Sequence, residues 1–156
     1  MGDPSDLFNY TSGRWIYNEI LRLSERQLFF NVSQLNRITA ASIGRPEQDV
    51  SYIRKLAEGG FNRVFEITLG EGTQVIARLP YPSTEPRIHA TASEVATMGF
   101  VRLHGVLVPR VLAYSASDQN PVGSEYIIME KAPGNELGDL WYTMTERQRL
   151  KMIFEM

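Results

Sequence analysis

The chain has 156 residues, 43% of them hydrophobic and 22% charged, which is an ordinary composition for one globular domain with one core. Its net charge of -2 argues against nucleic acid as a partner, because that binding needs clustered basic surface. The absence of cysteine excludes disulfides and thiolate metal sites, and no apolar run is long enough to span a membrane.

The first 50 residues predict a helical extension. Trp15 to Leu23 give a broken helical pattern that could dock on a larger body. A clearer helix begins after Asn31, because Asn31 is a good N-cap and Gln34, three residues later, completes a capping box. Gly44 and Pro46 then predict the end of this helix.

From Ser51 the apolar pattern alternates with a period of two, which predicts strands. Proline-rich sequence ends the first three strands, and a helix is expected before two more. The expected order is β-β-β-α-β-β, an α+β layer built on a five-stranded antiparallel sheet and one helix. The expected strands are 53–56, 64–69, 75–79, 108–114 and 125–129, with the helix at 88–103.

The turn after the first strand is rich in glycine. Residues 56–64 keep only the middle glycine, Gly59, of the kinase pattern G-x-G-x-x-G-x-V. Gly60 and Phe61 follow it, and Asn62 stands at the third glycine position, where its tolerance of left-handed backbone angles could still make the turn. Such a loop lets backbone N–H groups approach phosphate oxygens, although a plain hairpin turn has the same composition.

The third strand carries the counterpart of a phosphate-binding lysine. In Val75-Ile76-Ala77-Arg78, Arg78 takes the place of the lysine of V-A-I-K, and alternation puts Ile76 on the same strand face. Ile76 and Val64 could then sandwich an adenine ring. Glu94, the only carboxylate in the middle of the following helix, is the natural partner of Arg78. The alternatives are an arginine at a strand edge and a solvated helix glutamate.

The fifth strand runs into a short polar connector like a kinase hinge. There the backbone carbonyl of Glu130 and the N–H of Ala132 would bind the adenine edge, with Met129 behind them as gatekeeper. An ordinary strand exit is the alternative. The order and spacing of these four weak signals, more than any one of them, favour a protein kinase-like small lobe.

Several longer sequence segments support a resemblance to a known family. The chain resembles the fungal branch of the aminoglycoside phosphotransferase-like family, close to the altered-inheritance-of-mitochondria proteins. An arginine in the third strand is usual in that branch. The resemblance covers nearly all of the chain, and its words are residues 10–15 (YTSGRW), 56–64, 75–82 (VIARLPYP), 93–98 (SEVATM), 120–126 (NPVGSEY) and 129–134 (MEKAPG).

The resemblance implies an ATP- and magnesium-dependent phosphotransferase that acts on a small hydroxyl-bearing substrate. It also implies a helical large lobe with a catalytic Asp, a nearby Asn and a magnesium-binding Asp. This chain has no His-x-Asp tripeptide, and Asp139 is its only aspartate after Met129. We therefore expect ATP binding to be weak or absent, magnesium only in a longer parent, and no activity from this chain alone. No catalytic or metal-binding residue is assigned.

The expected organisation is a helical extension at 1–50, a kinase-like small lobe at 51–131, and a hinge exit with the truncated start of a large lobe at 132–156. Its expected partners are a nucleotide and either the large lobe or a surface that replaces it. The alternative function is a catalytically dead interaction module that docks through Trp15, Trp141 and the exposed large-lobe side. The resemblance implies a mitochondrial location without a visible transit peptide, and a cytoplasmic one is the alternative.

Overall fold

The structure is a computed structural model that describes residues 4–155. Five strands form one antiparallel sheet in the order β1-β2-β3-β5-β4. The strands are β1 (Val50–Glu58), β2 (Asn62–Leu69), β3 (Gln74–Pro80), β4 (Val111–Ser115) and β5 (Tyr126–Glu130). The α-helices are α1 (Glu19–Ser24), α2 (Val32–Ser42), α3 (His89–Leu103), α4 (Leu137–Trp141) and α5 (Glu146–Glu155), and short 3-10 turns lie at Pro4–Leu7, Glu47–Asp49 and Gly70–Gly72.

The α+β fold expected from the sequence is confirmed, including the antiparallel meander of β1, β2 and β3 and the single helix between β3 and β4. The first strand is longer than the expected 53–56, because its pairing with β2 extends from Val50 to Glu58. The fourth strand starts at Val111 instead of Val108.

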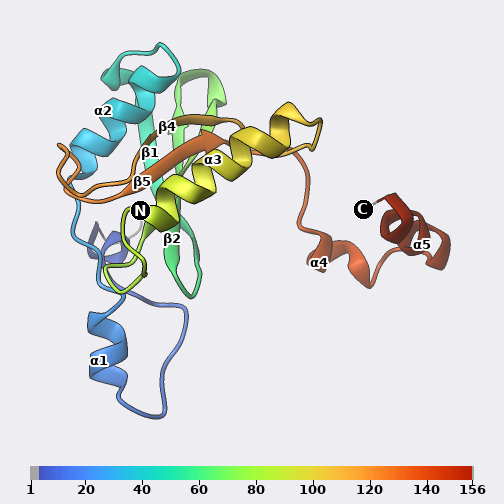
Figure 1. The fold of residues 1–156 in the computed structure, drawn as a ribbon, viewed down its shortest axis with the longest axis horizontal. Helices are drawn as coiled ribbons and strands as arrows, with labels where there is room; N and C mark the ends of the chain where they lie inside the picture. The colour runs from blue at the N-terminus through green and yellow to red at the C-terminus, as the bar shows by residue number, and fades with distance from the viewer. Residues whose placement is uncertain (1–3, 156) are drawn as a thin grey trace.

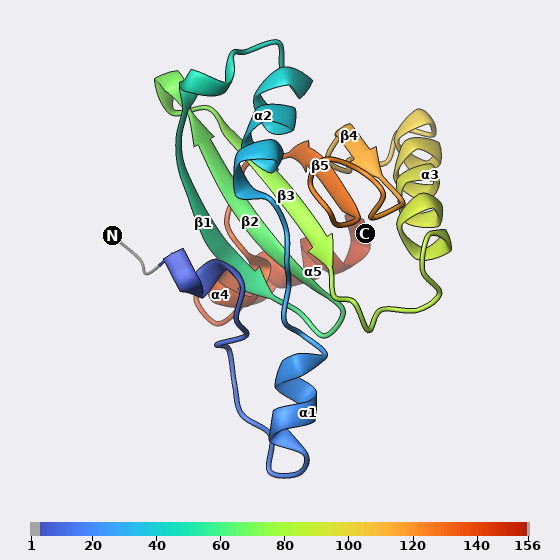
Figure 2. The ribbon, with the colours of Figure 1, turned by 90° about the vertical axis from the view of Figure 1, so that its left-hand side faces the viewer.

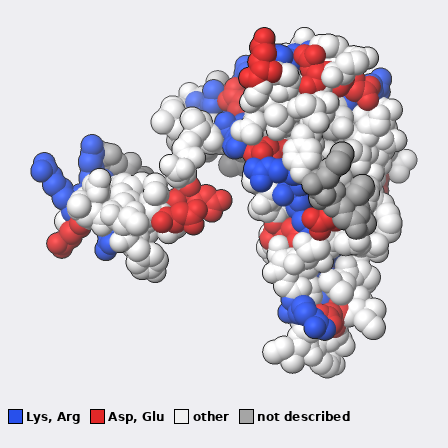
Figure 3. Space-filling view, turned by 180° about the vertical axis from the view of Figure 1, so that it is seen from behind, with Lys and Arg blue, Asp and Glu red and all other residues white. Residues whose placement is uncertain are grey.

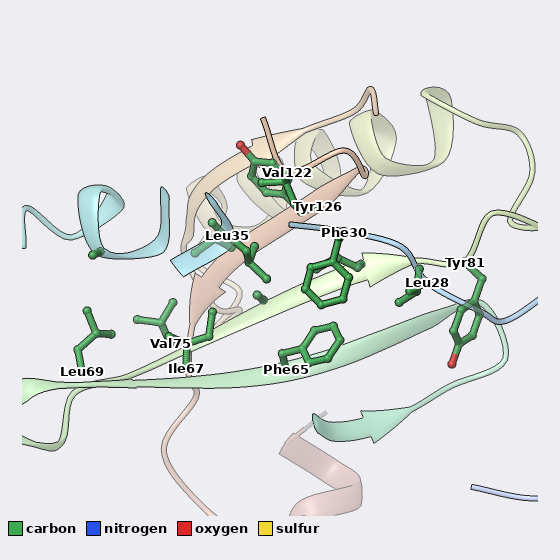
Figure 4. Close-up of a cluster of buried hydrophobic side chains, with 14 residues drawn as sticks. Leu28, Phe30, Leu35, Phe65, Ile67, Leu69, Val75, Tyr81, Val122 and Tyr126 are labelled. Carbon is green, nitrogen blue, oxygen red and sulfur yellow. The ribbon is translucent and has the colours of Figure 1, made fainter. Parts of the chain in front are cut away.

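The two faces of the sheet are covered differently. In β2, the odd-numbered Phe65, Ile67 and Leu69 are buried on the face that the N-terminal extension covers. Figure 2 shows α2 and the segment that leads into it lying across this face. Figure 4 shows Leu28, Phe30 and Leu35 of the extension among the strand side chains, so the extension and the sheet share one core.

The opposite face carries a smaller apolar cluster beneath α3. Ile76, Ile127 and Met129 are buried there, and Val95 and Met98 of α3 pack against them. Alternation along the strands therefore commits alternate residues to two separate clusters.

Helix α2 begins as expected but with half of its capping box. The Asn31 side chain accepts the Gln34 amide at 3.0 Å. The Asn31 amide donates to the carbonyl of Val122 at 2.8 Å instead of to the Gln34 side chain. The reciprocal bond expected from the sequence is therefore wrong, because the loop before β5 has taken its donor. In α5, by contrast, Thr145 and Gln148 form both bonds of a capping box.

Helices α4 and α5 stand apart from the sheet on a narrow connection (Figures 1 and 3). The apolar stripe of α5 is uncovered, with Leu150, Ile153 and Phe154 exposed by 47%, 51% and 84%. The boundaries at residues 50 and 131 remain predictions.

Candidate nucleotide-binding site

The glycine-rich residues form the turn between β1 and β2. The amide of Gly59 donates to the carbonyl of Asn62 at 2.9 Å and closes the turn. In the described part of the chain, the amides of Gly60 and Phe61 donate to no acceptor, and the Phe61 side chain is 72% exposed. The tip thus offers two free N–H donors, the groups with which such loops bind phosphate.

The turn does not use the backbone geometry expected for Asn62. Positive φ angles occur at Asn18, Glu71 and Ile88 among the described non-glycine residues, and at neither Asn62, Gly59 nor Gly60. Asn62 is instead the first residue of β2 and is paired with Pro80. The prediction of a left-handed backbone at Asn62 was wrong, because the turn closes through the Asn62 carbonyl, which accepts the Gly59 amide.

Arg78 of β3 and Glu94 of α3 form an ion pair between Nη1 and Oε1. Their side chains are 32% and 31% exposed, so the pair is accessible to solvent. In the described part of the chain the Arg78 side chain has no other hydrogen-bond or ion-pair partner. The guanidinium therefore retains N–H donors that could receive an anion.

A small cavity of about 80 Å³ adjoins this pair. It lies between the turn, the end of β3, the start of α3 and β5. Its lining residues are Phe61, Asn62, Arg78, Pro80, Thr84, Ala90, Thr91, Glu94 and Ile127. The structure thus brings the glycine-rich turn, Arg78 and Glu94 around one space.

The apolar residues expected around an adenine share the same sheet face. Val64 is paired with Arg78, and Ile76 is paired with Met129. Ile76 and Met129 are 9% and 8% exposed, whereas Val64 packs against their cluster and is half-buried. This arrangement gives an apolar floor next to a cation, although contact with adenine remains a prediction.

The hinge residues lie at the end of β5. Glu130 pairs with Val75, and its amide donates to the carbonyl of Arg110 at 3.0 Å. The backbone amide of Arg110 lowers the pKa of Glu130 against the opposing effect of burial, and the Arg110 guanidinium adds to the lowering. Ala132 is exposed just beyond the strand, so its N–H remains a candidate.

A buried carboxylate near the hinge was missed by the sequence reasoning. The Glu66 side chain is 2% exposed and binds Arg54 Nε at 2.7 Å and Lys131 Nζ at 2.6 Å. The hydrogen bond from Arg54 lowers the pKa of Glu66 despite burial, with help from Lys131. Since Lys131 belongs to the connector, this cluster fastens the connector to the sheet.

A second missed pair lies at the root of the glycine-rich turn. Glu58 ends β1, Arg63 lies opposite it in β2, and Nε and Oε1 are 2.8 Å apart. Burial alone would raise the pKa of Glu58, but hydrogen bonds from Ser12, Thr11 and Lys55 and the charge of Arg63 lower it overall. The signal available in the sequence was two opposite charges bracketing residues 59–62.

The start of α3 is held by a carboxylate that lies just before β5. Ile88, its N-cap residue, cannot cap with its side chain, and its amide donates to Glu125 Oε1 at 3.2 Å. The Thr91 hydroxyl donates to Glu125 Oε2 at 2.6 Å. A negative charge suits a helix N-terminus, so Glu125 fixes the helix that presents Glu94.

Among residues 4–155, no group of three or more His, Asp or Glu side chains is placed to hold a metal ion. None of the helices in this range is long and apolar enough to cross a membrane.

A kinase-like small lobe with an Arg–Glu pair under a glycine-rich turn is the arrangement of a phosphotransferase, and sequence comparison agrees. Residues 53–156 match the phosphotransferase enzyme family, to which this chain belongs.

Three similar proteins come from fungi. The chain is 52% identical, over 60% of its length, to a subtelomeric hrmA-associated cluster protein of Aspergillus fumigatus, and it covers 18% of that protein. It is 29% identical, over 98% of its length, to altered inheritance of mitochondria protein 9, mitochondrial, of Clavispora lusitaniae, covering 31% of it. The Candida tropicalis protein of the same name is 30% identical over 92% of the chain. The chain thus spans less than a third of these relatives.

Proposed function

We propose that this chain is the nucleotide-binding portion of an ATP-dependent, kinase-like phosphotransferase that acts on a small hydroxyl-bearing substrate. The observation that carries the proposal is the Arg78–Glu94 pair, accessible beside an apolar floor and beneath a turn with free N–H groups. The residues fit ATP because they combine a cation, amide donors and an apolar surface.

In this proposal the adenine lies between Val64 and Ile76, with Met129 behind it. The backbone of Glu130 and Ala132 meets its polar edge. The turn of residues 59–62 covers the phosphates, and Arg78, held by Glu94, binds them.

Arg78 would act as a fixed positive charge. A guanidinium stays charged at any physiological pH and presents several N–H groups in one plane, so it can bind two phosphate oxygens while Glu94 holds its other side. Phosphoryl transfer also needs metal-borne charge and a group that orients the acceptor hydroxyl. The sequence of this chain offers no His-x-Asp tripeptide for these roles, and we infer that the 156-residue chain alone does not transfer phosphate.

The proposal is tested by isothermal titration with ATP and with adenosine. Replacing Arg78 by Gln removes charged hydrogen bonds worth roughly 1.5–3 kcal/mol, so ATP affinity should fall about 10- to 100-fold. Adenosine affinity should not change, because adenosine has no phosphate.

Arg45→Gln is the matched control. Arg45 is 30% exposed and ion-paired with Glu71 in the turn between β2 and β3, and neither residue lines the cavity beside Arg78. The proposal fails if the unchanged chain binds no ATP at millimolar concentration, or if both substitutions weaken ATP equally.

Location follows only from the relatives. Two of those described above carry a mitochondrial name, and we propose a mitochondrial location for this protein, with the cytoplasm as the alternative. A fluorescent fusion that stays cytoplasmic would contradict the mitochondrial assignment.

A further inference from the structure

The proposed phosphate-binding turn stands on a buried ion pair. Glu58 and Arg63 immediately flank residues 59–62, and their side chains are 1% and 0% exposed. A buried charge is costly unless its hydrogen-bonding capacity is filled. The hydrogen-bond partners of these two side chains therefore influence where the root of the turn lies.

Most of those partners come from the N-terminal strap, which we define as residues 7–26; Lys55 of β1 adds a cation 3.2 Å from Glu58 Oε1. Arg63 donates through Nη1 to the carbonyl of Leu7 at 2.9 Å and through Nη2 to that of Arg26 at 3.3 Å. Glu58 Oε2 accepts the Thr11 amide at 2.9 Å and the Ser12 hydroxyl at 2.7 Å. The strap thus binds both residues that flank the turn. The two ends of the strap bind Arg63, and residues 11 and 12 bind Glu58.

The strap is closed on itself around Arg26. The Arg26 guanidinium lies 4.7 Å from the centroid of the Trp15 ring, and the rings of Trp15 and Tyr10 are 4.9 Å apart. This packing gives the YTSGRW segment at residues 10–15 a structural role. The segment holds Thr11 and Ser12 in place against Glu58.

The other side of the turn is tied to the segment after β3. The carbonyl of Phe61 accepts the Tyr81 amide at 2.9 Å. The Tyr81 ring in turn lies 5.5 Å from the Arg63 guanidinium. Root and tip of the turn are therefore linked through one network, so a change at the strap should reach the free amides of Gly60 and Phe61.

We infer that the N-terminal strap is a positioning element for phosphate binding: through Glu58 and Arg63 it sets the conformation in which residues 59–62 meet the nucleotide phosphates. The inference rests on the proposed function. The competing account is that the strap docks on the hairpin for stability alone and leaves the turn unchanged.

The test uses the full chain and the variants Ser12→Ala and Ser12→Thr. Ser12→Ala removes one bond to a charged acceptor and leaves Arg63 in place, so the fold should survive. By hydrogen exchange, the Gly59 and Tyr81 amides should exchange about tenfold faster. ATP affinity should fall several-fold, about 3- to 10-fold, while adenosine affinity is kept. Ser12→Thr retains a hydroxyl, so its amide exchange rates and its ATP affinity should match those of the unchanged chain.

Ser33→Ala is the matched control, since Ser33 is also exposed and donates to a glutamate, Glu47, at 3.0 Å. It should leave the Gly59 and Tyr81 amides and ATP affinity unchanged. Glu58→Gln is the stronger variant and should exceed the effect of Ser12→Ala if it folds.

Two results would overturn the inference. One is an unchanged exchange rate at Gly59 and Tyr81 in Ser12→Ala, and the other is an equal loss of ATP and adenosine affinity. If the unchanged chain binds no ATP, the proposed function fails, and the exchange arm still decides whether the strap controls the turn.

Discussion

Phe30 gives the sharpest test of how the N-terminal extension relates to the sheet. Its side chain is 9% exposed, and its ring centroid lies 5.2 Å from that of Phe65 in β2 and 5.3 Å from that of Phe8. Phe30→Ala would leave a cavity between the two, at a cost of about 3–5 kcal/mol. At roughly 2–4 °C per kcal/mol for a chain of this size, the melting temperature should fall by about 6–20 °C.

Phe29 provides the control in the neighbouring position. Its side chain is 71% exposed, so Phe29→Ala should change the melting temperature by less than about 2 °C. Calorimetry of both variants measures the difference. If the extension and sheet form one core, Phe30→Ala lowers a single transition. Equal effects of the two variants, or a Phe30→Ala variant with a separate transition for residues 1–50, would refute this reasoning.

Three further predictions follow from the caps and buried carboxylates. Asn31→Ala removes the N-cap of α2 and should lower the free energy of unfolding by about 1 kcal/mol in a denaturant titration; no change would contradict the cap. Thr145→Ala should reduce helical circular dichroism and speed amide exchange in α5 without changing exchange in the sheet, because α5 stands apart. Glu58 and Glu66 have lowered pKa values, so their contribution to stability is full above about pH 4.3 and is lost as pH falls through their folded values. Glu66→Gln should flatten that acid-side decline in a pH-resolved melting series, and an unchanged slope would contradict it.

The order of strands and helices was predictable because apolar periodicity is local. Alternation marked β2 and β3, and a run of helical spacing marked α3. The pairing of Arg78 with Glu94 could also be anticipated, since it needed only a cation on β3 and a single carboxylate in mid-helix. Its geometry agrees with that expectation, whereas nucleotide binding at these residues remains a prediction.

The clusters around Glu58 and Glu66 could not be predicted in the same way. Their partners lie far along the chain: Ser12 is 46 residues from Glu58, and Lys131 is 65 residues from Glu66. The nearby charge of Arg63 was visible beside Glu58, but nothing in local composition says that Ser12 will meet Glu58 or that Lys131 will meet Glu66. The half-formed capping box at Asn31 failed for the same reason, because Val122 competes for its amide from a remote loop.

Alternate side chains of β2 and β3 point to opposite faces of the sheet, and the two faces have different roles. In β2, Arg63 and Phe65 face the extension, whereas Val64 and Glu66 face the proposed cleft, and in β3 Arg78 continues the second face. The extension therefore stabilises the same backbone whose alternate side chains would bind the nucleotide. Because each residue belongs to one face, the core on one side can be optimised without placing bulk in the cleft. The two faces are connected only through the strand backbone. The strap can therefore act on the turn through Glu58 and Arg63, without contacting the cleft residues themselves.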